Sequence, residues 1–444
     1  MKPRALTLAI VLLSGSAAAE EAAPEAAPPI ATQAIDERKV TEMALRSHPT
    51  IGAAVAAREA AEAAASAADW ARVPELRLNA RYARLSSIPA QYRTFDGFTF
   101  PQLLNQVAGR ASVVVPLTDA FMSLAATARS AGHTAEAAAI DVVTARAQIA
   151  YEARAAFLDY WSRTLAVRNA TELVKAAENN AVDQRNREKA GTVAHNDVLA
   201  FETALDAAVM GLELAKGELA GAEASLRTYV PELRDKQLVV PDISFDDDAL
   251  ASTRVPVAPA VPPRLASLSE QTRAAAERAD AVAWQRLPSL SVYASGDMAA
   301  PNPRVFVATR LVFVPSWDVG VQLEWSLSQA TAGGARASQA RQEQAAFEAR
   351  LADARRRLDG ERQGAVGILT AATARARRAR DRVERAVALA KARRVESETG
   401  TALPLNVVLA ETDLARARNE YVEAFVMRAL ALAKIDFIDG RAAP

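Results

Sequence analysis

Hydrophobic residues recur along this chain at two different spacings, in separate segments, and the two spacings predict different kinds of structure. Apolar and polar residues alternate one by one in the segments 75–85, 109–117, 289–295 and 318–327. A period of two places successive side chains on opposite faces of a strand. In the first segment one face carries Leu76, Leu78, Ala80 and Tyr82, and the other carries Arg77, Asn79 and Arg81. The sequence therefore predicts four strands in two hairpins.

Each hairpin is followed by a long segment that has no proline. Residues 119–190 and 328–398 are these segments, and at about 1.5 Å per residue each predicts a helix of roughly 100 Å. The second segment has small and apolar residues at alternating spacings of three and four, as in a coiled coil. They are Leu369, Ala372, Ala376, Ala379, Val383, Ala386 and Ala390. After a turn near Gly191 or Gly400, the chain is predicted to return as a second helix.

The whole order of elements occurs twice. Trp70–Leu76 and Trp284–Leu290 share four of seven residues, and Gly191–Leu205 and Gly400–Leu414 share six of fifteen. Matches in the same order indicate an internal duplication. The predicted divisions are a signal peptide (1–19), a disordered lead (20–35), a first repeat (36–230), a proline-rich linker (231–263), a second repeat (264–439) and a tail (440–444).

Composition narrows the classes of function. Residues 1–19 have a basic start, a short apolar run and small residues at the end, which is typical of a secretory signal peptide. Lysine plus arginine and aspartate plus glutamate both number 53, so nucleic acid is not an expected partner. The chain has no cysteine and only three histidines, and it lacks the glycine-rich nucleotide motifs and the metal-binding and nucleophile motifs of enzymes. We expect no enzymatic activity, cofactor or metal.

The predicted strands allow two interpretations. A single amphipathic hairpin usually packs on a helical core, but two hairpins with strands of about 9 to 11 residues also suit the wall of an outer-membrane barrel. Four strands cannot close a barrel, and an open edge in lipid leaves backbone groups unpaired. Several chains would then share one barrel.

The order of elements from about Asp36 to Asp439 resembles the outer-membrane efflux protein (TolC) family. In both halves a helix with a proline at its end leads to a strand, a loop, a strand, a very long helix, a Gly-Thr turn and a return helix. The resemblance implies a mainly α fold with membrane β structure. Three chains would form a homotrimer with a twelve-stranded β-barrel in outer-membrane lipid and a coiled-coil α-barrel across the periplasm.

The resemblance also implies roles for individual residues. Gly191, Thr192, Gly400 and Thr401 would form the tips where a periplasmic adaptor (membrane fusion protein) docks, and Asp197 matches a polar position that helps to lock the closed state. The two positions that carry carboxylates at the aperture in well-known members fall at Asn406 and Leu409 here. Rings of Leu409 from three chains could form an apolar constriction that closes by dewetting.

The predicted function is an outer-membrane exit duct of a tripartite efflux or type I secretion system. It would passively conduct substrates from an inner-membrane transporter and its adaptor to the exterior. The alternative is a soluble periplasmic coiled-coil adaptor, which would share the signal peptide and the alanine-rich heptads. The strands of an adaptor should face a globular core, whereas the strands of a duct should face lipid.

Overall fold

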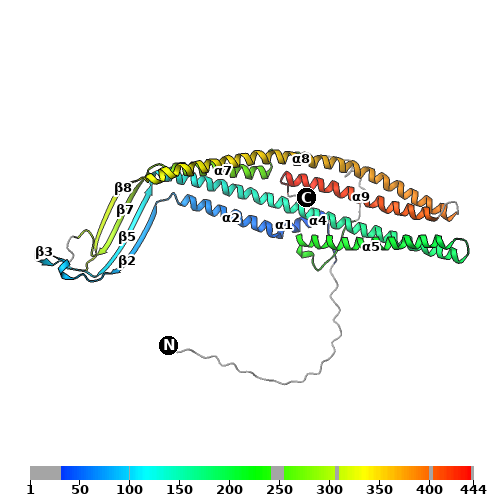
Figure 1. Cartoon of the computed structure of the whole chain (residues 1–444), viewed down its shortest axis with the longest axis horizontal. Helices are drawn as coiled ribbons and strands as arrows, with labels where there is room; N and C mark the ends of the chain where they lie inside the picture. The colour runs from blue at the N-terminus through cyan, green and yellow to red at the C-terminus, as the bar shows by residue number, and fades with distance from the viewer. Residues whose placement is uncertain (1–31, 100, 242–254, 306–309, 400–403, 442–444) are drawn as a thin grey trace, which may run out of the picture.

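The computed structural model describes residues 32–99, 101–241, 255–305, 310–399 and 404–441. Long helices run side by side along one axis, and a four-stranded sheet projects from one end of them (Figure 1). At the far end of the same axis, residues 190–194 turn the chain back from one long helix to the next. The sheet and this turn therefore lie at opposite ends of an elongated molecule.

Each half of the chain contributes a short helix, a long helix and a returning helix. In the first half these are α2 (Pro49–Trp70), α4 (Ser123–Lys189) and α5 (His195–Tyr229). In the second half they are α7 (Pro263–Trp284), α8 (Leu327–Glu398) and α9 (Pro404–Ile438). The correspondence supports the predicted duplication, and the helix ends lie within a few residues of the predicted ones. Within the described ranges, no helix combines the length and the apolar composition that a membrane crossing requires.

Local signals explain several of the helix ends. The first half also has α1 (Glu37–Ser47), whose N-cap Asp36 accepts a 2.7 Å hydrogen bond from the Lys39 N–H through Oδ1. His48 is extended between α1 and α2 because the residue before a proline avoids the helical region. A short helix, α3 (Leu117–Phe121), precedes α4, and Met122 between them has φ −113° and ψ −89°, outside the helical region.

The sheet has the order β2-β5-β7-β8, and all neighbouring strands are antiparallel. Its strands are β2 (Glu75–Arg84), β5 (Asn105–Pro116), β7 (Ser289–Ala300) and β8 (Val314–Glu324). The pairing of β5 with β7 joins the two halves of the chain. These two strands extend farther from the helices than predicted, because the backbone ladder continues where the alternation of side chains has faded.

The loops at the far end of the sheet contain short elements. The β2–β5 connection holds η1 (Ala90–Tyr92) and the small hairpin of β3 (Thr94–Phe95) and β4 (Phe98–Thr99). β8 begins four residues before the predicted segment 318–327 and ends at Glu324. Residues 325–327 leave the ladder to enter α8.

Two of the predicted divisions need correction. Residues 1–31, which include the predicted signal peptide, lie outside the described residues, but the last part of the predicted disordered lead is ordered. β1 (Thr32–Ala34) pairs in parallel with β6 (Gln237–Val239), and Ile35 is buried. The start of the predicted linker is also structured, as η2 (Pro231–Leu233). Burial of Ile35 and Leu233 in the central core, which the proline-rich composition did not reveal, explains both differences.

The central core lies midway along the helices, where α1, α4 and α5 meet. Val40, Phe157, Trp161 and Leu226 are all buried in it. The Trp161 indole N–H donates a 2.9 Å hydrogen bond to the Pro241 carbonyl, so the ring is both packed and paired. This core fixes the first half of the chain and the start of the connection to the second.

The predicted coiled-coil seam of α8 is confirmed. Leu369, Ala372 and Ala376 are at most 1% exposed, and Ala417 and Tyr421 of α9 are buried in the same way. Small side chains at these positions let the two helices approach closely. Burial raises the pKa of the Tyr421 hydroxyl, although Arg380 acts in the opposite direction.

The α8–α9 seam generates a test of packing. Ala376→Leu should lower the free energy of unfolding by about 1–3 kcal/mol, because the added methyl groups have no space at a fully buried position. Thermal unfolding followed by circular dichroism measures the change. Ala374→Leu, at an exposed position of the same helix, is the control. Equal effects of the two substitutions would contradict the seam.

Candidate channel wall and helical tips

The register of the sheet gathers the apolar side chains of all four strands on one face. Leu78 lies beside Ala111, Ala111 beside Gly296, and Gly296 beside Trp317. The same face carries Leu76, Ala80, Tyr82, Val107, Gly109, Val113, Val115, Leu290, Val292, Ala294, Met298, Pro315, Val319, Val321 and Leu323. Most of these large side chains are exposed, including Leu78 (78%) and Val321 (67%). A continuous apolar face exposed on one side matches the lipid-facing surface of a membrane barrel.

Aromatic residues stand at both ends of this apolar face. Tyr82 and Trp317 lie toward the loops, and Trp70 and Trp325 lie where the sheet joins the helices; all four are exposed. Within β8, Trp317 and Leu323 are about 20 Å apart along the strand direction at roughly 3.3 Å per residue, and Trp325 follows directly after the strand ends. An apolar band of this order is found in outer-membrane barrels, where it is about 25 Å tall. The Trp325 indole N–H donates to the Arg286 carbonyl at 3.3 Å. Tyrosine and tryptophan favour the interface between lipid and water at such positions.

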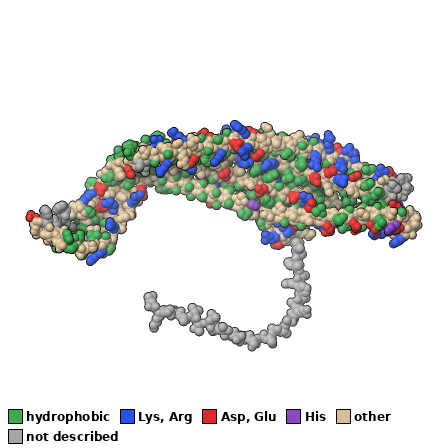
Figure 2. Space-filling view, viewed as in Figure 1, with side chains coloured by type: hydrophobic (Ala, Val, Ile, Leu, Met, Phe, Trp, Pro, Cys, Tyr) green, Lys and Arg blue, Asp and Glu red, His purple; other side chains and the backbone are tan. Residues whose placement is uncertain are grey.

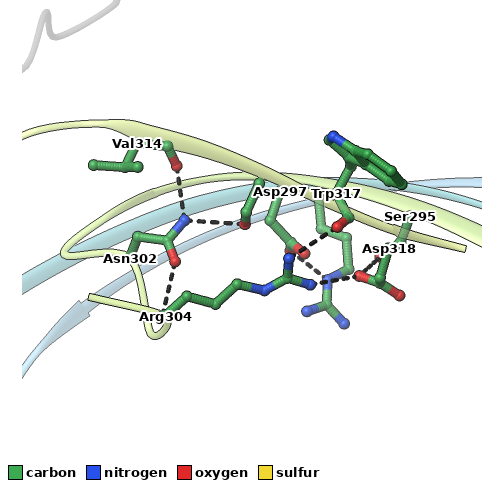
Figure 3. Close-up of polar contacts among 9 residues, drawn as sticks. Ser295, Asp297, Asn302, Arg304, Val314, Trp317 and Asp318 are labelled. Carbon is green, nitrogen blue, oxygen red and sulfur yellow. Dashed lines mark hydrogen bonds and ion pairs between the residues drawn. The ribbon is translucent and has the colours of Figure 1, made fainter. Parts of the chain in front are cut away.

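The opposite face of the sheet is polar and carries a network of charges. Arg110 of β5 pairs with Asp297 of β7 at 2.5 Å. Asp318 of β8 accepts hydrogen bonds from the Ser295 hydroxyl at 2.8 Å and from Arg304 at 3.2 Å. Figure 3 shows Arg304 reaching across from the β7–β8 connection towards Asp318. The network crosses the sheet and links the two halves of the chain.

The β7–β8 connection is anchored onto this polar face. Asn302 is 2% exposed, and its amide donates to the Val314 carbonyl at 2.8 Å and to the Ser316 hydroxyl at 3.0 Å (Figure 3). Its Oδ1 accepts the Arg304 N–H at 2.9 Å, and Arg304 Nη1 donates to the Trp317 carbonyl at 2.8 Å. The sequence analysis did not identify Asp297, Asn302, Arg304 or Asp318. The sequence did offer one clue to the two aspartates. Each is a charged residue at a polar-face position: Asp318 lies within a predicted strand, and Asp297 lies two residues beyond one.

The tip between α4 and α5 contains Gly191 and Thr192, which the resemblance assigned to adaptor docking. Gly191 has φ +74°. Its N–H donates to the Glu188 carbonyl at 2.8 Å, and the Thr192 N–H donates to the Arg187 carbonyl at 2.9 Å. This pair of bonds is the Schellman motif that ends a helix with a left-handed residue. The Thr192 hydroxyl also donates to the Arg187 carbonyl, so the tip is tightly defined.

The other residues assigned by resemblance have different surroundings. Asp197 is exposed in the first turn of α5. Gly400 and Thr401 lie outside the described residues. On α9, Asn406 is half-buried and Leu409 is 56% exposed, while Val407 between them is buried. Leu409 therefore projects away from the helices of its own chain.

A buried carboxylate near the tips connects three helices. Glu411 of α9 is 9% exposed. It accepts hydrogen bonds from Arg394 of α8 at 2.8 Å and from Asn180 of α4 at 3.1 Å. The sequence analysis missed this site, because a single glutamate on a helix looks like a solvated surface residue. Glu411 fastens the α8–α9 pair to the first half of the chain near the predicted aperture.

Charges on the long helices are of both signs and dispersed (Figure 2). Ion pairs join α9 to its neighbours along its length: Arg418 pairs with Glu172 of α4 at 2.5 Å, and Arg375 of α8 pairs with Glu423 at 3.5 Å. Such pairs are largely exposed and each contributes little to stability. They connect α9 to both α4 and α8.

The tip geometry gives a second test. Gly191→Val should destabilise the α4–α5 turn by about 1–2 kcal/mol, because a branched side chain is strained at positive φ. Hydrogen exchange at the Thr192 amide, which bonds to Arg187, measures the loss. Gly191→Asn is the control, since asparagine tolerates this conformation. Unchanged protection in the valine variant would contradict the motif.

Comparison with known proteins gives a result by structure and none by sequence. No family model matches the sequence, and a search of curated proteins finds no match. The Campylobacter jejuni CmeC outer membrane channel matches with a TM-score of 0.76 at 12% identity, over 90% of this chain and 85% of that one. CusC, a protein whose structures are described as showing transmembrane channel formation, matches with a TM-score of 0.75 at 14% identity, over 91% of both chains.

A third channel agrees with these two. The outer-membrane channel OprN matches with a TM-score of 0.72 at 18% identity, over 90% of this chain and 89% of that one. The matches span both halves of this chain, including the helices and the sheet. The chain therefore has the fold of the outer-membrane efflux (TolC) channels, in which long helices carry a β domain, as the order of its sequence elements predicted.

Proposed function

We propose that this protein is a passive exit duct in the bacterial outer membrane. The observation that carries the proposal is the exposed apolar face of the four-stranded sheet, bounded by aromatic residues and backed by a polar face. In lipid such a sheet needs closure, because unpaired backbone groups at its edges are costly there. The fold shared with outer-membrane channels supports the same role.

The partner that closes the barrel is proposed to be further copies of the chain. In the described part of the chain, β2 and β8 each pair with a strand on one side only. Because neighbouring strands alternate in direction, the two edge strands β2 and β8 run antiparallel to one another. β8 of one copy can therefore continue the antiparallel pattern by pairing with β2 of the next copy. Three copies would give the twelve strands expected for a homotrimer. The helices below would then extend from the membrane into the periplasm.

The tips are proposed to bind a periplasmic adaptor that connects the duct to an inner-membrane transporter. Gly191 and Thr192 lie on a tightly turned, exposed tip at the end distant from the sheet. Asp197 is exposed beside them, and Gly400 and Thr401 are proposed for the second tip. The adaptor would favour the open duct only if it binds that state more tightly than the closed one. An efflux pump and a type I secretion system remain the two candidate assemblies.

The closed state is proposed to depend on an apolar constriction at Leu409. Its side chain and that of Leu405, one turn earlier on α9, are exposed in the single chain, and rings of such residues exclude water. Asn406, three residues before Leu409 on α9, is half-buried beside it. Opening would move the α8–α9 pair away from α4, which breaks the Asn180–Glu411 hydrogen bond.

The alternative, a soluble periplasmic adaptor, is not favoured. It requires the strands to pack on a globular core, whereas Leu78, Val319 and Val321 on the apolar face are at least 65% exposed. We propose no enzymatic activity, because the fold relatives are channels and the sequence analysis finds no catalytic motif.

Fractionation and conductance test the proposed duct together. The protein should appear as a heat-resistant trimer in outer-membrane extracts and should produce ion currents in planar bilayers. Its release by osmotic shock as a monomer, with no current in bilayers, would contradict the duct and favour the adaptor.

The proposed constriction gives a separate test. Leu409→Ser should increase single-channel conductance and antibiotic leakage by several-fold, because a hydroxyl favours water in a narrow pore. Bilayer recording and antibiotic susceptibility measure these effects. Val408→Ser, at the neighbouring half-buried position, is the control. Unchanged conductance and leakage in Leu409→Ser would remove Leu409 from the gate.

A further inference from the structure

The polar face of the sheet carries more arginines than aspartates around a hollow that reaches from Arg77 to the β7–β8 connection. The hollow has a volume of 820 Å³, and its lining includes four arginines and two aspartates. These are Arg77, Arg81, Arg110, Arg304, Asp297 and Asp318. We propose that this hollow makes the outer exit of the duct attractive to anions, and that it binds carboxylate or phosphate groups of solutes in passage. The inference rests on the proposed duct, in which this face lines the water-filled lumen.

Both aspartates in the hollow are already engaged. Asp297 pairs with Arg110, and its side chain is only 16% exposed, whereas that of Arg110 is 61% exposed. Asp318 accepts from Ser295 and Arg304, and the Arg304 side chain is 56% exposed. Asp297 is therefore largely covered and Asp318 is 35% exposed, while the Arg110 and Arg304 guanidinium groups are the more exposed member of each pair. A guanidinium has five N–H donors, so each arginine keeps donors for an anion.

Arg81 gives the face its excess of positive charge. Along the sheet it is level with Ala108 of β5, Ala299 of β7 and Val314 of β8, none of which is acidic. Within the described residues the structure gives Arg81 no ion pair, and its side chain is exposed. Arg77, four residues closer to the helices on β2, pairs with Glu75 at 2.7 Å, but both side chains are more than half exposed. An exposed pair of this kind leaves the arginine available.

Closure of the barrel by further copies should preserve this excess. The strand that would meet β2 is β8, whose polar face carries Asp318 and Glu324. Asp318 is held by Arg304 and Ser295, and Glu324 is the last residue of β8 at the helical end. Arg81 lies towards the opposite end. Repetition around a narrow lumen would focus the field of these arginines and raise the local concentration of anions.

Reversal potentials in planar bilayers test the inference with the full-length protein. Under a tenfold gradient of potassium chloride, the wild-type channel should prefer chloride. Arg81→Gln should reduce the ratio of chloride to potassium permeability by about twofold, as expected for loss of one partly screened charge per chain. Arg84→Gln is the matched control. Arg84 lies on the other face of β2, where it donates to Asn105 at 2.9 Å, and its loss should leave the ratio unchanged.

The outcomes separate this inference from the proposed duct. A wild-type current that prefers potassium, or equal ratios for wild type and Arg81→Gln, would overturn the anion-attracting exit alone. The absence of any wild-type current would overturn the duct and this inference with it. Inorganic phosphate, added at constant ionic strength, should reduce the wild-type chloride current more than that of Arg81→Gln. The wild-type measurement decides the sign of the preference even if the variant does not insert.

Discussion

The backbone hydrogen bonds of the four-stranded sheet constrain everything else in this protein. In lipid each N–H and C=O group must find a partner, and a strand edge cannot obtain one from water. The sheet has an apolar face suited to lipid, but among the described strands β2 and β8 are paired on one side only. An assembly of identical chains satisfies those edges. The proposed barrel and the proposed trimer are therefore two aspects of one requirement.

The helices meet a different constraint, because they must stand close together in water without a large core. Alanine-rich seams such as that of Leu369, Ala372 and Ala376 on α8 allow close packing at low cost in side-chain entropy. Within the described residues, polar contacts between the closely packed helices are few near the tips. Glu411, bound to Arg394 and Asn180, is the buried contact near the proposed aperture.

Local patterns in the sequence predicted the long helices and the strands of the main sheet, but not the β1–β6 pair or the contacts between elements. Period-two segments and proline-free segments predicted the strands and the long helices, and Gly191 marked a helix end because a left-handed residue favours glycine. Arg110 and Asp297 are 187 residues apart, and their pairing depends on the register between β5 and β7. Burial of Glu411 and of Ile35 likewise depends on distant elements. Asn406 and Leu409 could be proposed only through the resemblance to a family.

The most direct test of the account asks which face of the sheet meets lipid. The chain has no cysteine, so single cysteines at positions 76 to 81 of β2 can be labelled without background in proteoliposomes. A membrane-impermeant maleimide should react at positions 77, 79 and 81 and should fail at positions 76, 78 and 80. Reaction at all six positions, or the reverse alternation, would contradict a sheet whose apolar face lies in lipid and whose polar face lines a lumen.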